Sequence, residues 1–131
     1  MTSARRGGPH DSILVVDDEV DLVRTYERLL RRQGYRVVSV GSRDAGLLAV
    51  QAEALRLVIT DLRLPDGDGL DIVRAARAVT PPLPVLVATV LGSPVVRDAC
   101  LAAGASAFLT KPFSVVTLVN AVHDLLGVTR D

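Results

Sequence analysis

The sequence has 131 residues, the size of one domain, and its 15 basic and 15 acidic side chains cancel. Without a net positive charge, we expect no direct binding of nucleic acid and no attraction to an anionic membrane surface. The window PLPVLVATVLGSPVV is too short for a membrane span, and the opening MTSARRGGPHDS lacks the apolar run of a signal peptide. The single cysteine excludes an internal disulfide and fits a cytoplasmic protein.

Five short apolar segments alternate with segments of helical periodicity. The apolar segments are SILVV (12–16), RVVSV (36–40), LRLVIT (55–60), LPVLVA (83–88) and SAFLT (106–110). Most are continuous rather than alternating, which is typical of strands that are covered on both faces. We expect a flexible tail over residues 1–11, one domain over 12–127 and a short stub over 128–131.

Local signals predict where the helices lie. The apolar stripe of the first helix is formed by Leu22, Val23, Tyr26, Leu29 and Leu30. The predicted starts of later helices are Ser42, Ser93 (with Pro94 next) and Ser114, and the predicted ends are Gly34, Gly104 and Gly127. Another helix is predicted within LDIVRAARAVT, before Pro81.

A strand followed by a helix, five times over, predicts an α/β fold. Because crossovers between parallel strands are right-handed, we expect a doubly wound, five-stranded parallel sheet with helices on both faces, in the flavodoxin-like order. Ligands of such folds gather outside the carboxyl ends of the strands. The residues that leave each strand are therefore the candidate site.

Four of the five strand ends carry charged or hydroxyl side chains. They are Asp17, Asp18 and Glu19 after the first strand, Asp61 after the third, Thr89 at the end of the fourth and Lys111 after the fifth. Like charges this close repel, so a positive charge is expected among them. Lys111 supplies one, and the oxygen ligands suit a Mg²⁺ ion, which needs only one or two carboxylates.

Each of these residues could also serve the fold alone. Glu19 is best explained as a helix N-terminal residue favoured by the helix dipole. Asp61 could cap the LPDGDG turn, but Asp66 and the residues after it already supply turn chemistry there. Alone, Thr89 or Lys111 would indicate little, and their convergence at one edge is what indicates a site.

The expected chemistry is phosphoryl transfer. A carboxylate held near Mg²⁺ can attack phosphorus because the metal neutralises the repulsion between two anions. Asp61 would be the nucleophile, Lys111 and the metal would hold phosphoryl oxygens, and Thr89 would donate a hydrogen bond.

The motifs VVDDE, TDLRLPDGDG, the threonine after the fourth strand and KPF, in this order and spacing, resemble the receiver domain of two-component response regulators over about residues 12 to 127. The resemblance implies that Asp61 accepts a phosphoryl group from a histidine kinase, a histidine phosphotransfer protein or a small acyl phosphate. It also implies direct Mg²⁺ binding by Asp18, Asp61 and the backbone carbonyl of Arg63, with Asp17 acting largely through water. Such a domain is a phosphoacceptor that signals, rather than an enzyme.

The resemblance also implies a switch. Lys111 would pair with the phosphoryl group, and its bond to the following proline would be cis. Thr89 would swing toward the phosphoryl group and let Phe108 turn inward. Phe108 stands where the family often has tyrosine, so switching would depend on packing alone. Val90 stands where a smaller residue is usual, and we expect its bulk to slow phosphotransfer or hydrolysis.

The output is expected to reach an unidentified downstream effector. The helix over 94–103 is apolar nearly all round, which fits either a buried helix or a docking face remodelled by phosphorylation. A homodimer would form through the 94–126 face. His123 is expected at the surface, late in the last helix. The chain is either a stand-alone receiver or an excised part of a longer protein.

Three alternatives differ from this interpretation. A pseudo-receiver would signal by binding without phosphorylation, although the intact acidic, threonine and lysine positions disfavour it. A phosphatase of the haloacid dehalogenase type needs a second aspartate where Arg63 stands. A flavin- or nucleotide-binding domain would place an anion cradle after the first strand, where Asp17, Asp18 and Glu19 would repel phosphate.

Overall fold

The computed structural model of the chain describes residues 12–127, so the predicted tail over 1–11 and stub over 128–131 lie outside the described residues. The elements in chain order are β1 Ser12–Val16, α1 Val20–Arg32, β2 Arg36–Val40, α2 Arg43–Ala52, β3 Leu55–Thr60, β4 Arg63–Leu64, β5 Gly67–Asp68, α3 Leu70–Ala78, β6 Val85–Thr89, α4 Pro94–Ala102, β7 Ala107–Thr110 and α5 Val115–Leu126. Five of the strands and all five helices correspond to the predicted alternation.

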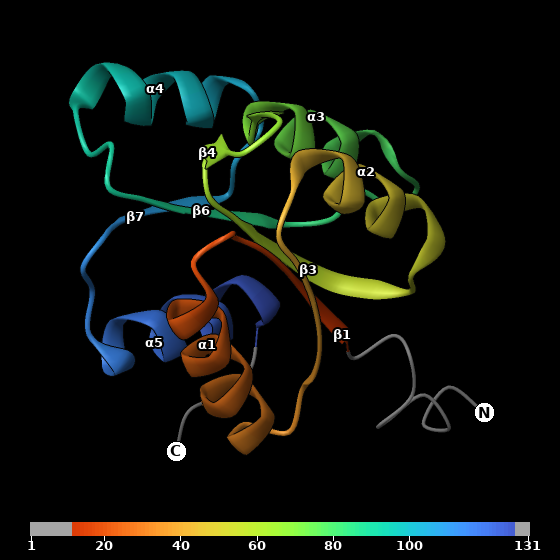
Figure 1. Cartoon of the computed structure of the whole chain (residues 1–131), viewed down its shortest axis with the longest axis vertical. Coiled ribbons are helices and arrows are strands. Elements are labelled where there is room, and N and C mark those ends of the chain that lie inside the picture. Colours follow the sequence, from red (N-terminus) through yellow and green to blue (C-terminus); the bar gives the residue numbers. More distant parts are fainter. Residues whose placement is uncertain (1–11, 128–131) are drawn as a thin grey trace.

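The five long strands form one parallel sheet in the order β2-β1-β3-β6-β7. Helices α1 and α5 cover one face, and α2, α3 and α4 cover the other (Figure 1). The predicted doubly wound sheet is therefore confirmed. The short strands β4 and β5 pair antiparallel with each other, within a stretch that the sequence predicted only as a turn.

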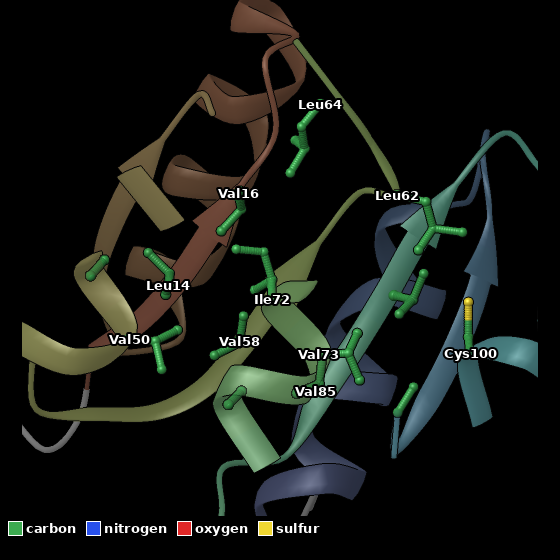
Figure 2. Packing of buried hydrophobic residues seen from close by; sticks show 14 residues of the cluster. Leu14, Val16, Val50, Val58, Leu62, Leu64, Ile72, Val73, Val85 and Cys100 are labelled. Atoms are coloured by element: carbon green, nitrogen blue, oxygen red, sulfur yellow. The ribbon is translucent and has the colours of Figure 1, made fainter. Parts of the chain in front are cut away.

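The core has two halves, one on each face of the sheet. Alternate residues of β1 point to opposite faces, so that Leu14 and Val16 pack against α2 and α3 while Ile13 and Val15 pack against α1 and α5. Figure 2 shows the first half, with Cys100 of α4 at its edge. This two-sided burial explains why the central strands read as continuous apolar runs.

The predicted helix ends are built as the sequence indicates. The hydroxyls of Ser42, Ser93 and Ser114 each accept a hydrogen bond from the backbone amide three residues later. After α1, Gly34 has a φ of +93°, and its amide and that of Tyr35 donate to the carbonyls of Arg31 and Leu30. This is a Schellman motif, which favours glycine because of the positive φ.

Of the two interpretations of the 94–103 segment, a buried helix or a docking face, helix α4 does not fit the first. Of its nine residues only Cys100 is buried, and Val95 is 79% exposed. The helix lies over the edge of the sheet formed by β6 and β7 (Figure 1). It is therefore not a buried helix, although its composition is apolar.

His123 also differs from expectation. It is half-buried, and its ring centroid lies 6.4 Å from that of Tyr35. Its Nδ1 is buried and has no hydrogen-bond partner within residues 12–127. None of the helices in residues 12–127 has the length and hydropathy to cross a membrane.

Candidate functional site

Three predicted site residues meet at the carboxyl edge of the sheet. The Nζ of Lys111 lies 2.7 Å from Oδ2 of Asp17 and 2.8 Å from Oδ2 of Asp61, and it donates a hydrogen bond to each. The side chains of Lys111, Asp17 and Asp61 are 8%, 3% and 12% exposed. The ammonium thus lies between two nearly buried carboxylates and supplies the positive charge that the acidic residues require.

The sheet itself fixes these residues relative to one another. Each lies one position beyond a strand, and its amide donates to the neighbouring strand: Asp17 to the carbonyl of Val40, Asp61 to that of Val16 and Lys111 to that of Thr89. The hydrogen-bond ladder therefore continues one residue past the strands. The site residues are held by the same register that holds the core.

The remaining oxygens of the two carboxylates are bound to the backbone. Oδ1 of Asp61 accepts from the amides of Leu62 at 2.6 Å and Arg63 at 3.4 Å, and Oδ1 of Asp17 accepts from the amide of Glu19 at 3.0 Å. Both side chains are thereby oriented at two points each, which leaves little freedom for either to rotate.

Charge is not balanced within the site. Burial alone would lower the pKa of Lys111, but its hydrogen bonds to Asp17 and Asp61 outweigh burial and raise that pKa. The ammonium stays charged, yet it faces Asp17, Asp61 and the exposed Glu19, whose Oε1 lies 3.8 Å away. The exposed Asp18 adds a further negative charge at the same strand end. The excess of negative charge attracts a cation.

The donor set fits a hard divalent cation. No three His, Cys, Asp or Glu side chains in the described range are grouped to hold a metal by themselves. A Mg²⁺ ion does not need such a group, because it retains several waters and binds through one or two carboxylates. Asp61 and Asp18 with the Arg63 carbonyl offer only oxygen ligands, which are the type that Mg²⁺ prefers.

The predicted switch residues lie beside this site. Thr89 is fully buried, and its Oγ1 accepts a hydrogen bond from the amide of Leu91 at 3.3 Å. Phe108, on β7, is half-buried against the core half that contains Cys100. The Lys111–Pro112 peptide bond is cis, as the resemblance implies. No hydrogen bond joins Thr89 to Asp61 among residues 12–127.

Val90 is 63% exposed and borders a pocket of about 290 Å³ that also contains Lys111. The pocket is otherwise lined by Glu19, Leu22, Pro112 and Phe113. Val90 and Lys111 thus line the same pocket.

Tyr26 has a feature that its place in the apolar stripe of α1 does not reveal. The side chain is 1% exposed, as that stripe predicts, and its ring centroid lies 6.1 Å from that of Phe113. Its hydroxyl, however, is buried without a hydrogen-bond partner among the described residues. Burial foremost, and then the charges of Asp17, Asp61 and Glu19, raise the pKa of Tyr26. Helical side chains lean toward the N-terminus, which directs this hydroxyl toward the acidic site.

A second missed signal concerns Lys111. The chain has 15 basic residues, and Lys111 is its only lysine; the others are arginines. An ammonium is a compact charge with three donors, whereas guanidinium is a planar fork suited to one carboxylate. Lysine suits this position because its compact ammonium can contact the two separate carboxylates of Asp17 and Asp61. The presence of a single lysine in the sequence would by itself have indicated Lys111 as a candidate site residue.

Comparison with known proteins agrees with this geometry. The family model of the response regulator receiver domain matches residues 13–123. The chain is 35% identical over 128 residues to the probable transcriptional regulatory protein TcrX of Mycobacterium tuberculosis, covering 95% of this chain and 55% of that protein. It is 36% identical over 116 residues to the transcriptional regulatory protein GlrR of Escherichia coli, covering 87% of this chain and 26% of that protein. The chain therefore spans about half of the first relative and about a quarter of the second.

Experimental structures give the same result. The CheY-like response regulator receiver domain protein of Methanospirillum hungatei matches with a TM-score of 0.84 at 26% identity, over 89% of this chain and 94% of that one. The receiver domain of the sensor histidine kinase PA1611 of Pseudomonas aeruginosa, which has a magnesium ion coordinated in its active site cleft, matches with a TM-score of 0.80 at 28% identity, over 89% and 98%. The chain thus belongs to the family of response regulator receiver domains of two-component signalling.

Proposed function

We propose that this receiver domain, over residues 12–127, accepts a phosphoryl group on Asp61 from a histidine kinase or a histidine phosphotransfer protein. The observation that carries the proposal is the position of Asp61. Its Oδ2 lies 2.8 Å from the Lys111 ammonium, its Oδ1 is fixed by backbone amides, and its side chain remains partly accessible. An oriented carboxylate beside a permanent positive charge is what an anionic phosphoryl donor requires.

The transfer is a displacement at phosphorus. A carboxylate oxygen of Asp61 forms the new O–P bond while the N–P bond of a phosphohistidine breaks, and the imidazole leaves with the electron pair. Lys111 stabilises the charge that builds on the phosphoryl oxygens. Because its ammonium already contacts Asp61, Lys111 needs only a small shift to follow the new oxygens.

The metal that fits this site is Mg²⁺. Asp18, Asp61 and the backbone carbonyl of Arg63 would hold it directly, and Asp17 largely through water. When bound, it supplies positive charge that lowers the repulsion between the carboxylate and the phosphoryl group. The magnesium in the cleft of the PA1611 receiver domain supports this assignment by similarity.

Thr89 and Phe108 would carry the signal away from Asp61. Thr89 Oγ1 accepts from Leu91 but donates to no acceptor among the described residues, so its proton is available to a phosphoryl oxygen. A rotation of Thr89 toward Asp61 would open space at the end of β6. Phe108 of β7, which is half-buried and pairs with Val87 two residues before Thr89, would turn into that space.

The output surface would be the 94–126 face. It contains the exposed apolar residues Val95 and Leu101 of α4 and Val115 and Val116 of α5. A downstream effector or a second copy of the chain would dock there when Phe108 turns inward. The relatives TcrX and GlrR are named transcriptional regulatory proteins, which supports control of transcription as the outcome.

The decisive experiment is intact mass spectrometry with acetyl phosphate and Mg²⁺. We expect a gain of about 80 Da, the mass of one phosphoryl group, which chelation of the metal and the Asp61→Asn substitution both abolish. Absence of the gain in the wild-type chain, with a folded CD spectrum, would favour a pseudo-receiver. A gain that persists in Asp61→Asn would place the modification elsewhere.

A further inference from the structure

The β4–β5 hairpin, residues 63–68, is attached to the start of α2 by a single carboxylate. Oδ1 of Asp66 accepts from the amide of Arg43 at 2.7 Å, and Oδ2 accepts from the amide of Asp44 at 2.9 Å. These contacts join segments more than 20 residues apart. Asp66 was expected only to shape its own turn, and the structure gives its carboxylate a partner on another element.

The contact completes the cap of α2. The first amides of a helix have no partner within the helix. Here the amide of Ala45 donates to Oγ of Ser42 at 3.1 Å, and Asp66 accepts from the two amides before it. The cap is thus shared between a local residue and a distant one, and the distant one carries the negative charge that a helix N-terminus favours.

Arg43 holds the same junction from the other side. Its Nε donates to Oδ2 of Asp71 in α3 at 2.8 Å, and a guanidinium nitrogen lies 2.7 Å from Asp44. The Arg43 side chain passes so close to the hairpin that a side-chain carbon added to Gly67 would overlap it. A larger residue at position 67 would therefore require the Arg43 side chain to move.

The other end of the hairpin is attached to Asp61. The amides of Leu62 and Arg63 donate to Oδ1 of Asp61, and the amide of Gly69 donates back to the carbonyl of Leu62 at 2.7 Å. Any side chain on Gly69 would overlap the carbonyl oxygen of Asp61. The backbone of Arg63 therefore lies in a short loop closed at Asp61 and tied at its tip to α2.

The start of α2 also lies against the acidic doublet. A side-chain carbon on Gly41, just before the helix, would lie 3.9 Å from both the carbonyl oxygen of Asp17 and the Cα of Asp18. The two parts of the proposed metal site, one after β1 and one after β3, are thus linked through the N-terminus of α2. Asp66 is the only side chain of the hairpin that hydrogen-bonds to α2 among the described residues.

We propose that Asp66 is a positioning residue for Mg²⁺, because its bond to the start of α2 sets where the hairpin presents the Arg63 carbonyl relative to Asp18 and Asp61. This inference rests on the proposed function of the site. Residues that orient metal ligands without touching the metal typically change its affinity about tenfold or more when they are replaced. Loss of the Asp66 contacts would let the hairpin tip move and would weaken metal binding without removing a ligand.

The test compares two caps of the same helix. Mg²⁺ is titrated at constant ionic strength into wild type, Asp66→Ala, Asp66→Asn and Ser42→Ala, and backbone amide NMR shifts give each Kd. Both alanine variants remove a cap of α2, but only Asp66→Ala releases the hairpin. We expect the Kd to rise about tenfold for Asp66→Ala, to rise less for Asp66→Asn, which keeps one acceptor oxygen, and to stay within about twofold for Ser42→Ala.

A kinetic readout separates positioning from general damage. With acetyl phosphate, the Mg²⁺ concentration for half-maximal phosphorylation should rise in Asp66→Ala while the rate at saturating Mg²⁺ stays near that of wild type. Equal Kd values in wild type and both Asp66 variants would overturn the inference, as would an equal rise in Ser42→Ala. If Asp66→Ala does not fold, Asp66→Asn decides alone. If wild type binds no Mg²⁺, the proposed metal site fails together with the inference.

Discussion

Lys111 and Asp17 are 94 positions apart in the sequence, yet the Nζ of one lies 2.7 Å from Oδ2 of the other, and both side chains are almost completely buried. The pair joins the first strand end to the last. A ligand that binds the Lys111 ammonium must compete with this ion pair, so the strength of the pair affects how tightly the ligand binds.

The Lys111→Met substitution should destabilise the metal-free protein. It leaves Asp17 and Asp61 close together without a counter-charge, and breaking a buried ion pair costs about 3 kcal/mol or more. Urea unfolding should show this loss, and Mg²⁺ should recover part of it by replacing the missing charge. A loss below about 1 kcal/mol would mean that the ammonium contributes little to the resting state.

Tyr26→Phe should stabilise the protein by about 1 kcal/mol, because the hydroxyl it removes is buried and has no partner in the described part of the chain. Unfolding in urea at pH 7 measures the change. A loss of stability instead would show that the hydroxyl has a partner in solution, such as a bound water.

The stabilisation by Tyr26→Phe should increase in alkali. Burial raises the pKa of Tyr26 above its ordinary value of 10.0, so the unfolded chain loses this proton near pH 10 while the folded chain keeps it. Wild-type stability therefore falls as the pH rises above 10, and the variant lacks this contribution. The raised pKa of Lys111 acts in the same direction in both proteins and cancels in the comparison.

Gly69→Ala should be far more damaging than Gly34→Ala. A side-chain carbon at residue 69 would overlap the Asp61 carbonyl oxygen and lie 2.8 Å from the Cα of Leu62, both of which are rigid backbone. We expect a loss of about 3 kcal/mol and a displaced Asp61. At Gly34, where nothing lies within 4 Å, only the positive φ opposes alanine, at about 1 kcal/mol. Similar melting temperatures for the two variants would contradict this.

Asp66→Asn should lower the melting temperature at pH 7 and have little effect in acid. Hydrogen bonds from the amides of Asp44 and Arg43 lower the pKa of Asp66 below its ordinary 3.8. The stability that its charge contributes is thus present above pH 3.8 and is lost as the pH falls through the lowered pKa. Melting curves of both proteins from pH 7 downward should converge, and a gap that persists below the lowered pKa would count against a charge-based cap.

Val90→Ala should quicken phosphorylation by acetyl phosphate. Val90 lines the pocket that contains Lys111, and a smaller side chain would leave more room beside the ammonium. We expect roughly a threefold faster rate, equivalent to about 0.6 kcal/mol of barrier, measured by intact mass over time, and faster hydrolysis by the same argument. Unchanged rates of both steps would show that Val90 does not control access.

Local patterns in the sequence predicted the fold because the relevant signals act over a few residues. Ser42, Ser93 and Ser114 cap the helices they precede, and Gly34 ends α1 as its position indicates. The convergence of Asp17, Asp61 and Lys111 was predictable because parallel strands end at one edge. The family is confirmed, whereas the phosphoacceptor and metal roles stay predictions.

What the sequence did not reveal depends on distant neighbours. The carboxylate of Asp66 resembles any turn residue until α2 is placed beside it. The hydroxyl of Tyr26 could not be known to lack a partner before the core was packed. The exposure of α4 contradicts its apolar composition, because composition does not record how far a helix lies from the sheet.

The weak attachment of α4 to the core has a consequence for local unfolding of this domain. A helix with only Cys100 fully buried and Val96 partly buried against the core costs little to detach. Its amide hydrogens should therefore exchange with deuterium well before those of α5, which is anchored by Leu118 and Val122. Helix α4, which lies beside Thr89 and Phe108, is therefore the part of the molecule that a small rearrangement at the strand ends can most readily shift.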